Sequence, residues 1–150
     1  MDYTIKPATI ERIEEIYLAN QRCFKRSESY SRRIFRHLLS HPKTIGYCAV
    51  TLDNQLVAFI FATFDDDGTG HISTLGVLPE HRRRGLAKKL ISHVEQMLVK
   101  KNITIVKLEV RVSNSEAQGL YRQLGYTIVQ RLKGYYSDGE DGFLMVKSLV

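Results

Sequence analysis

The segment best suited to chemistry is a basic turn, Arg82-Arg83-Arg84-Gly85-Leu86-Ala87, between a strand-like stretch and a helix-like stretch. The first N–H groups of a helix have no partner within the helix, and the positive end of the helix dipole lies beside them. Gly85 lets the backbone approach a ligand closely, and the small Ala87 leaves space next to it. The turn therefore predicts a binding site for a phosphate or pyrophosphate group.

Two common phosphate motifs do not fit this turn. It is not a Walker loop, because no Gly-Lys-Ser/Thr follows the glycine, and it lacks the G-x-G-x-x-G pattern of dinucleotide-binding proteins. Nucleotide hydrolysis therefore loses support. The plain alternative is a solvated helix start, because runs of charge usually lie on the surface. On the residues of the turn alone, both alternatives stay open.

Three side chains outside the turn are of types that move protons. Glu109 stands in a strand-like stretch between Lys107 and Arg111. His71 begins another strand, and Tyr121 belongs to an apolar helical stripe. Each has a plain structural alternative: an outward-facing strand charge, a strand-end histidine and a core tyrosine. The alternation of charges around Glu109, taken alone, favours the first of these alternatives.

The elements that must position these residues follow from hydrophobic spacing. The predicted order is β-α-α-β-β-β-α-β-α-β-β, with strands at 3–6, 44–52, 56–64, 71–77, 103–111, 126–132 and 143–147. Thr9, the loop 26–30, Gly85 and a capping box formed by Ser113 and Glu116 precede the four helices.

Connections between these elements indicate the sheet. Asp53-Asn54 is turn chemistry for an antiparallel hairpin. The helix between strands 71–77 and 103–111 favours a parallel crossover. The predicted fold class is therefore α/β (α+β), with a mixed central sheet and helices on both faces.

Composition limits the class of protein. The chain has 150 residues, of which 43% are hydrophobic, which fits one globular domain over 1–150 and excludes disorder of the whole chain. Lys and Arg number 22 against 16 Asp and Glu, which gives a formal net charge of +6. The basic residues concentrate at 22–43 and 82–89, so we expect an anionic partner.

The compartment can be inferred from what is missing. Cys23 and Cys48 form no C-x-x-C pair, so neither a disulfide framework nor a metal site is expected, and a reducing compartment is favoured. No stretch approaches the roughly 18 apolar residues of a membrane span, and Met1-Asp2-Tyr3 has no signal character. A cytoplasmic protein without a membrane partner is expected.

The run Asp65-Asp66-Asp67-Gly68 lacks the ligand spacing of a calcium loop and predicts a turn.

Four segments together resemble a known family. The stretch from Leu75 to Ala87 resembles the acetyl-CoA motif of the GNAT acetyltransferase superfamily, Arg/Gln-x-x-Gly-x-Gly/Ala after a strand and before a helix. The stretches 108–126 and 133–142 resemble the protein N-terminal acetyltransferases, and Arg26–Ser31 resembles their substrate loop more loosely. The likeness is to the NatA-type catalytic subunit, its stand-alone archaeal counterparts and the bacterial ribosomal-protein alanine N-acetyltransferase. The GNAT fold is thereby implied.

The resemblance implies a site for acetyl-CoA. The matching strand backbone in the family pairs with the pantetheine arm, and the matching turn holds the pyrophosphate. Asn114 and Tyr121 match further cofactor contacts, although Asn114 also suits a helix cap. The implied cofactor-binding residues are Leu75, Gly76, Val77, Arg82, Arg83, Arg84, Gly85, Leu86, Ala87, Lys88, Asn114 and Tyr121. Ala87 and Gly142 depart from the commoner glycine and alanine of the family, and neither departure threatens the assignment.

The resemblance also implies catalytic roles. Glu109 would be the general base, acting through a water, with His71 as an auxiliary base, since a histidine in the matching place of archaeal relatives assists the glutamate. Tyr121, twelve residues after Glu109, matches a tyrosine that approaches the acetyl-CoA sulfur and would protonate the departing thiolate. No covalent nucleophile and no metal are required.

Two further segments would line the peptide groove. Tyr135 and Tyr136 match tyrosines that bind the substrate backbone, and as neighbours on a strand they would face opposite sides. Phe24, Glu28 and Tyr30 would form the other wall, with Phe24 against the first substrate side chain. Protein N-termini and nascent peptides are the implied partners, and we expect a monomer or weak homodimer.

The chemistry favours α-amines as acceptors. An α-amine with a pKa near 7.7–8.0 is roughly a tenth neutral at pH 7, whereas a lysine is neutral at about one part in a thousand. The alternative enzyme is a GNAT acting on lysine or a small amine. A ribosome- or RNA-binding module is a rival from another class, but the chain lacks an RRM signature and has too much helix for an OB barrel. No sequence-specific nucleic-acid binding is expected.

A basic flank around Arg32, Arg33 and Arg36 would be compatible with ribosome association.

Overall fold

The computed structural model describes residues 2–26 and 28–150, so Ser27 of the predicted substrate loop lies outside it. Its strands are β1 (Tyr3–Pro7), β2 (Thr44–Thr51), β3 (Leu56–Phe64), β4 (Thr69–Val77), β5 (Ile105–Arg111), β6 (Thr127–Leu132) and β7 (Gly142–Ser148). Its helices are α1 (Ile13–Cys23), α2 (Arg32–Ser40), α3 (Leu86–Lys100) and α4 (Ser115–Gln123), with 3₁₀ turns at Ile10–Arg12 and Pro79–His81. The predicted order of strands and helices is confirmed.

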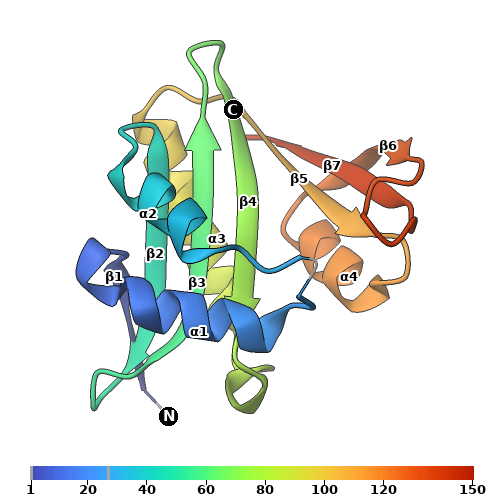
Figure 1. Cartoon of the computed structure of the whole chain (residues 1–150). Coiled ribbons are helices and arrows are strands. Elements are labelled where there is room, and N and C mark those ends of the chain that lie inside the picture. The colour runs from blue at the N-terminus through green and yellow to red at the C-terminus, as the bar shows by residue number, and fades with distance from the viewer. Residues whose placement is uncertain (1, 27) are drawn as a thin grey trace.

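The strands form one mixed sheet in the order β1-β2-β3-β4-β5-β7-β6 (Figure 1). The pair β4 and β5 is parallel, as the crossover through α3 predicts, and the other neighbouring pairs are antiparallel. The predicted turn at Asp53-Asn54 joins β2 to β3, and Asn54 has a φ of 64°, a left-handed conformation that asparagine tolerates well.

The parallel pair is short, and this opens the sheet. β4 and β5 pair at three positions only, from Thr69 opposite Ile105 to His71 opposite Lys107. Beyond them the two strands diverge, as Figure 1 shows. Ser73 is an extra residue in β4, because Ile72 lies opposite Ala62 and Thr74 lies opposite Phe61. A bulge of this kind bends and twists a strand, which helps to turn β4 away from β5.

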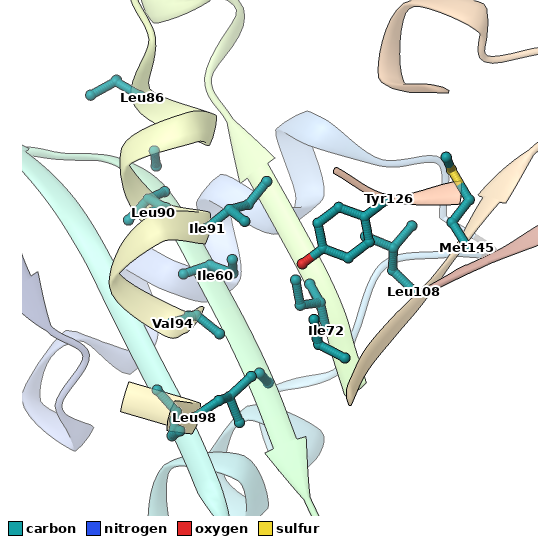
Figure 2. Packing of buried hydrophobic residues seen from close by; sticks show 14 of the residues in the cluster. Ile60, Ile72, Leu86, Leu90, Ile91, Val94, Leu98, Leu108, Tyr126 and Met145 are labelled. Atoms are coloured by element: carbon teal, nitrogen blue, oxygen red, sulfur yellow. The ribbon is translucent and has the colours of Figure 1, made fainter. Parts of the chain in front are cut away.

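Each face of the sheet has its own apolar cluster. On one face, α1 and α2 cover a cluster centred on Ile16, Phe35, Phe59 and Phe61, all fully buried. On the other face, α3 packs its apolar stripe against β3 and β4, and Tyr126 and Met145 extend this cluster to β5 and β7 (Figure 2). The predicted placement of helices on both faces is confirmed, so an apolar cluster packs against each face of the sheet.

Two predicted helix caps are wrong. The side chain of Thr9 makes no cap hydrogen bond, and the chain passes through the 3₁₀ turn Ile10–Arg12 before α1 begins. The α4 cap is Asn114 rather than Ser113, since Asn114 Oδ1 accepts the backbone N–H of Ala117 at 3.1 Å. The backbone N–H of Ser113 instead donates to Glu140 at 3.0 Å, which ties the start of α4 to the segment before β7.

A polar network links α3 to the C-terminal strands. The Tyr126 hydroxyl and Lys147 Nζ each donate to the carboxylate of Glu95, both at 2.8 Å. Burial, followed by the nearby carboxylate, raises the pKa of Tyr126 above its usual value, so its hydroxyl remains a donor. The Glu95 side chain is only 16% exposed. If its carboxylate were removed, water could replace it only poorly as the acceptor for Tyr126 and Lys147.

We expect Glu95→Ala to lower the free energy of unfolding by about 2–3 kcal/mol, because it leaves a half-buried ammonium and a buried hydroxyl without their acceptor. Urea unfolding followed by circular dichroism measures this. The adjacent exposed residue supplies a control, Gln96→Ala, for which we expect a change of about 0.5 kcal/mol or less. Equal changes in both variants would contradict a structural role for the network.

Candidate active site

A cleft of about 1440 Å³ opens where β4 and β5 part. Its walls come from the loop after α1, the ends of β4 and β5, the starts of α3 and α4, and the turn before β7. Every predicted site residue except His71 and Arg84 lines this cleft. The diverging strands thus bring together residues from both halves of the chain.

His71 and Glu109 meet at the point where the strands part. His71 Nε2 lies 2.7 Å from Glu109 Oε1, and the two side chains are 32% and 17% exposed. His71 is the last residue of β4 that pairs with β5, opposite Lys107, so Glu109 lies two residues beyond this pairing and on the same face of β5 as Lys107. The predicted alternation of charges along β5 is present, but the charged face of the strand borders the cleft. The pair can accept a proton from a group in the cleft and share it between carboxylate and imidazole.

Arg111, which the sequence analysis did not single out, joins three segments of the cleft. Its guanidinium bonds to Glu28 in the loop after α1, to Asp138 at 2.9 Å and to Glu140 at 2.6 Å. It also stacks on the ring of Tyr136 at 4.2 Å. One cation therefore holds the two loops that form opposite walls of the cleft. Its position two residues after Glu109 was an available signal, since alternate strand residues share a face.

The loop after α1 has a second anchor at Tyr30. The Tyr30 hydroxyl donates to the carbonyl of Ser73 at 3.0 Å, and its backbone N–H donates to Asn20 Oδ1 at 2.8 Å. Asn20 is fully buried in α1, and its position in line with the apolar stripe of that helix was the one sequence signal for it. Burial is the main cause of the raised pKa of Tyr30, which keeps its hydroxyl protonated. Phe24 and Glu28 line the cleft from the same loop.

Tyr135 and Tyr136 also line the cleft, but not in the predicted way. They lie in the turn between β6 and β7 rather than in a strand, so the expected opposite orientation is wrong. Their rings pack edge to face with centroids 5.0 Å apart. Tyr135 is 50% exposed, and burial together with the Glu109 carboxylate raises its pKa. Both hydroxyls are therefore neutral donors at physiological pH.

The basic turn has the backbone of an anion site. Among the described residues, the N–H groups of residues 83–88 have no hydrogen-bond acceptor in the chain. Arg83 and Gly85 both have left-handed φ angles, of 62° and 78°, which turn the chain into α3. A Cβ on Gly85 would meet no atom within 4 Å, so the positive φ explains this glycine better than close packing does. Lys88 and Arg83 line the cleft beside these donors, a combination that fits a pyrophosphate.

Other predicted cofactor contacts lie at the same end of the cleft. Arg82 Nε donates to the carbonyl of Val77 at 2.9 Å, so this arginine braces the end of β4. Arg84 is exposed and does not line the cleft. Asn114 lines the cleft while it caps α4. Tyr121 lines it as well and packs edge to face on Tyr126, and burial raises the pKa of Tyr121 to about 12.

The carboxylates around Arg111 make stability depend on pH. Hydrogen bonds from Ser113 and Arg111 hold the pKa of Glu140 below its usual range, and the backbone N–H of Glu140 with Arg111 does the same for Asp138. A carboxylate whose pKa is lower in the folded state stabilises the fold above its unfolded pKa, about 4.3 for Glu, and loses this contribution as pH falls through the folded value.

We therefore expect Glu140→Gln to lower the melting temperature at about pH 6 and to have a smaller effect at about pH 3.5, where the wild-type carboxylate is partly protonated. Circular dichroism melts of both proteins across this range measure the difference. A melting-temperature difference that stayed constant with pH would show that the charge of Glu140 does not stabilise the fold.

The geometry can be compared with known proteins. Residues 10–126 match the model of the "Acetyltransferase (GNAT) family". The chain belongs to the GNAT family. It is 32% identical to an N-alpha-acetyltransferase of Saccharolobus solfataricus, over 99% of this chain and 94% of that protein. It is 33% identical to the N-terminal acetyltransferase A complex catalytic subunit NAA10 of Arabidopsis thaliana, over 97% and 77% of the two chains.

A solved GNAT structure extends this comparison to three dimensions. A chain of the NatC complex, determined with Gag peptide and CoA bound, superimposes with a TM-score of 0.90 at 26% identity and covers 100% of both chains. The predicted family, the fold and the enzyme class, an N-acetyltransferase, are confirmed. The named relatives support N-terminal acetylation as the function.

The part of the chain that the structure describes holds neither a cluster of metal ligands nor a membrane-spanning helix. Over residues 2–26 and 28–150, no three His, Cys, Asp or Glu side chains are arranged to hold a metal ion. Within the same ranges, no helix is long and apolar enough to cross a membrane.

Proposed function

We propose that this GNAT enzyme transfers the acetyl group of acetyl-CoA directly to the α-amine of protein N-termini and nascent chains. The observation that carries the proposal is the His71–Glu109 pair at the point where β4 and β5 part, in contact at 2.7 Å and bordering the cleft. A base placed there can take the proton from an amine before it attacks. Tyr30, Tyr135 and Tyr136 supply neutral hydroxyls around the same point.

The cofactor end of the proposal rests on the basic turn and the open edge of β4. The free N–H groups of residues 83–88, with Arg83 and Lys88, would hold the pyrophosphate. Leu75, Gly76 and Val77 pair with β3 but lie beyond His71, the last residue of β4 that pairs with β5, so the backbone edge that faces β5 is available to the pantetheine arm. When bound, acetyl-CoA supplies a thioester carbonyl for the amine to attack and a sulfur that leaves as a thiolate.

The chain's own residues handle two protons in this scheme. Glu109, directly or through a water, accepts the amine proton, and His71 shares it across their hydrogen bond. Tyr121 would donate a hydrogen bond to the departing sulfur. Because burial raises its pKa to about 12, well above the roughly 8.5 of an ordinary cysteine thiol, complete transfer of its proton to a thiolate would be unfavourable. Hydrogen bonding by Tyr121, with the proton ultimately coming from the attacking amine, is the better scheme.

Direct transfer also agrees with the state of the cysteine in the cleft. Cys23 lines the cleft, and burial raises the pKa of its thiol. A raised pKa disfavours the thiolate that an acyl-cysteine mechanism would need. Both substrates would therefore be bound together, without a covalent acyl-enzyme.

The proposal also covers the compartment, the oligomeric state and the ribosome association of the enzyme. We propose a NatA-like activity in the cytoplasm, carried by one domain over residues 1–150 that acts as a monomer or weak homodimer. Its formal charge of +6 supports association with ribosomes, where nascent N-termini emerge. Co-sedimentation with ribosomes at increasing salt tests this part, and sedimentation that salt does not weaken would contradict it.

A panel of short peptides tests the activity. Peptides beginning with Ser, Ala, Met-Glu and Met-Leu, and one with a blocked N-terminus and an internal lysine, are incubated with acetyl-CoA, and CoA release is followed. We expect release with at least one free N-terminus and almost none with the blocked peptide, because the α-amine is about a hundredfold more often neutral at pH 7. Release with the blocked peptide alone would instead favour a lysine acetyltransferase.

A further inference from the structure

The outer face of α2 carries basic side chains that the proposed acetyl transfer does not use. Phe35 and Leu38 are buried beneath the helix. Arg33, Arg36 and His37 are exposed on the side away from them, three to four residues apart, which places them on one face. We call these three residues, with His41 directly after the helix, the α2 outer face. His41 continues the row, and its ring lies against His37 with centroids 5.3 Å apart.

The charge on this face is not neutralised within the chain. α2 contains no acidic residue, and among the residues that the structure describes, Arg33 and Arg36 pair with no carboxylate. Arg32 differs from them, although it belongs to the same helix. Its guanidinium bonds to Glu14 at 2.7 and 2.9 Å and stacks on the ring of Tyr17 at 3.9 Å. Arg32 is therefore a paired cation on the side of α2, and the unpaired charge lies on the outer face.

The position of α2 separates this charge from the cofactor. α2 packs on one face of the sheet and α3 on the other (Figure 1). The sheet thus lies between the α2 outer face and the turn at residues 83–88, which we assign to the pyrophosphate. α2 also follows directly on the loop that brings Glu28 and Tyr30 into the cleft. An anionic polymer on α2 would lie next to the peptide wall of the cleft and leave the phosphate turn uncovered.

We propose that the α2 outer face binds the phosphate backbone of RNA without reading its sequence. The inference rests on the proposed association with ribosomes and names the surface that makes the contact. Arginine is suited to phosphate, because its planar guanidinium can donate two hydrogen bonds to one phosphate group. The rings of His37 and His41 can add stacking on an unpaired base. Phosphate contacts of this kind position a protein without giving sequence specificity.

Two other anionic partners compete with RNA for the same face. Membrane binding by an amphipathic helix needs large apolar side chains to insert, but Phe35 and Leu38 are buried, Leu39 is partly buried in the same cluster, and Ile34 is exposed at 44%. A peptide that binds as a strand or a helix would need a sheet edge or a groove, whereas an acidic motif can also bind an arginine cluster directly, so competition by polyglutamate is part of the test. The active-site cleft and a smaller cavity beside α1 are both lined without any α2 residue. The α2 outer face thus lies outside both cavities, and its exposed arginines and two histidine rings are best matched by a phosphate backbone with adjacent bases.

Fluorescence anisotropy with a labelled RNA stem-loop of mixed sequence, which offers both a phosphate backbone and unpaired bases, tests the proposal. Wild-type protein, the double variant Arg33→Gln/Arg36→Gln and the control Arg32→Gln are titrated between about 50 and 200 mM salt. Losing two phosphate contacts should reduce the slope of log K against log salt by about 1.4–1.8, whereas Arg32→Gln should leave the slope nearly unchanged. Vesicles with anionic lipid and a polyglutamate peptide are titrated in parallel as competitors.

The outcomes separate this inference from the proposed activity. No RNA binding by the wild type, an unchanged slope in the double variant, or tighter binding to vesicles or polyglutamate than to RNA would each overturn it. The double variant should acetylate peptides at the wild-type rate, since Arg33 and Arg36 lie outside the cleft. RNA binding by an enzyme that acetylates no peptide would refute the proposed function and leave the RNA surface standing.

Discussion

Glu109→Gln is expected to lower kcat for peptide acetylation by about two to three orders of magnitude, which is typical of losing a general base. The amide keeps the size of the side chain and can still bond to His71, so the cleft should keep its shape. The KM for acetyl-CoA should change little, because the phosphate turn lies at the other end of β4 from Glu109. Steady-state kinetics with each substrate varied in turn measure both constants.

A second carboxylate of the cleft gives a matched control. Glu116 also lines the cleft, from the first turn of α4, but it is exposed and has no contact with His71. Glu116→Gln removes the same charge from the same cavity, and we expect less than a tenfold change in kcat. If Glu109→Gln and Glu116→Gln lowered kcat equally, the activity would depend on the total negative charge of the cleft, which would contradict a specific role of Glu109 as the base.

The second large effect is expected at Arg111. Arg111→Met removes the cation shared by Glu28, Asp138 and Glu140, and the Arg111 side chain is only 15% exposed. Breaking a partly buried ion pair leaves its partners uncompensated, so we expect a loss of about 2–4 kcal/mol in the free energy of unfolding. The two walls that it joins should also separate, which should lower kcat/KM for the peptide by about a hundredfold while the KM for acetyl-CoA changes little.

Arg131→Met is the control for this prediction. Arg131 pairs with a single carboxylate, Asp141, and its side chain is 59% exposed, so its loss should change stability by about 1 kcal/mol or less. Arg111→Lys should be intermediate, because an ammonium restores the charge but not the planar array of donors. If Arg111 served stability alone, the Arg111→Met variant would have the wild-type kcat/KM when measured below its melting temperature.

The fold could be predicted well because its signals are local. Period-two and period-3.6 spacing gave the order of the elements, and the crossover through α3 implied the parallel pair. The bulge at Ser73 and the three-residue limit of that pairing could not be predicted, because they depend on how β4 packs between β3 and the helices on both faces. Asn114 and Ser113 were both acceptable caps, and the bond from Ser113 to Glu140, distant in sequence, decided between them.

The same contrast between local signals and contacts distant in sequence applies to the site residues. Most residues of one continuous motif, the turn from Arg82 to Lys88, could be predicted at the cleft from local sequence, although Arg84 does not line it. Asn20 and Arg111 could not, because each acts through partners on other elements: Tyr30 for the first, and both loops of the cleft for the second. The pairing of His71 with Glu109 likewise depends on the register of two strands separated by α3.

The most direct test uses one peptide that offers both kinds of amine, a free N-terminus and an internal lysine. After incubation with the enzyme and acetyl-CoA, fragmentation mass spectrometry locates the acetyl group. We expect acetyl on the α-amine, little on the lysine, and a large loss of product with Glu109→Gln. Acetyl on the lysine alone, or on the α-amine at the same rate with Glu109→Gln, would contradict N-terminal acetylation with Glu109 as the base.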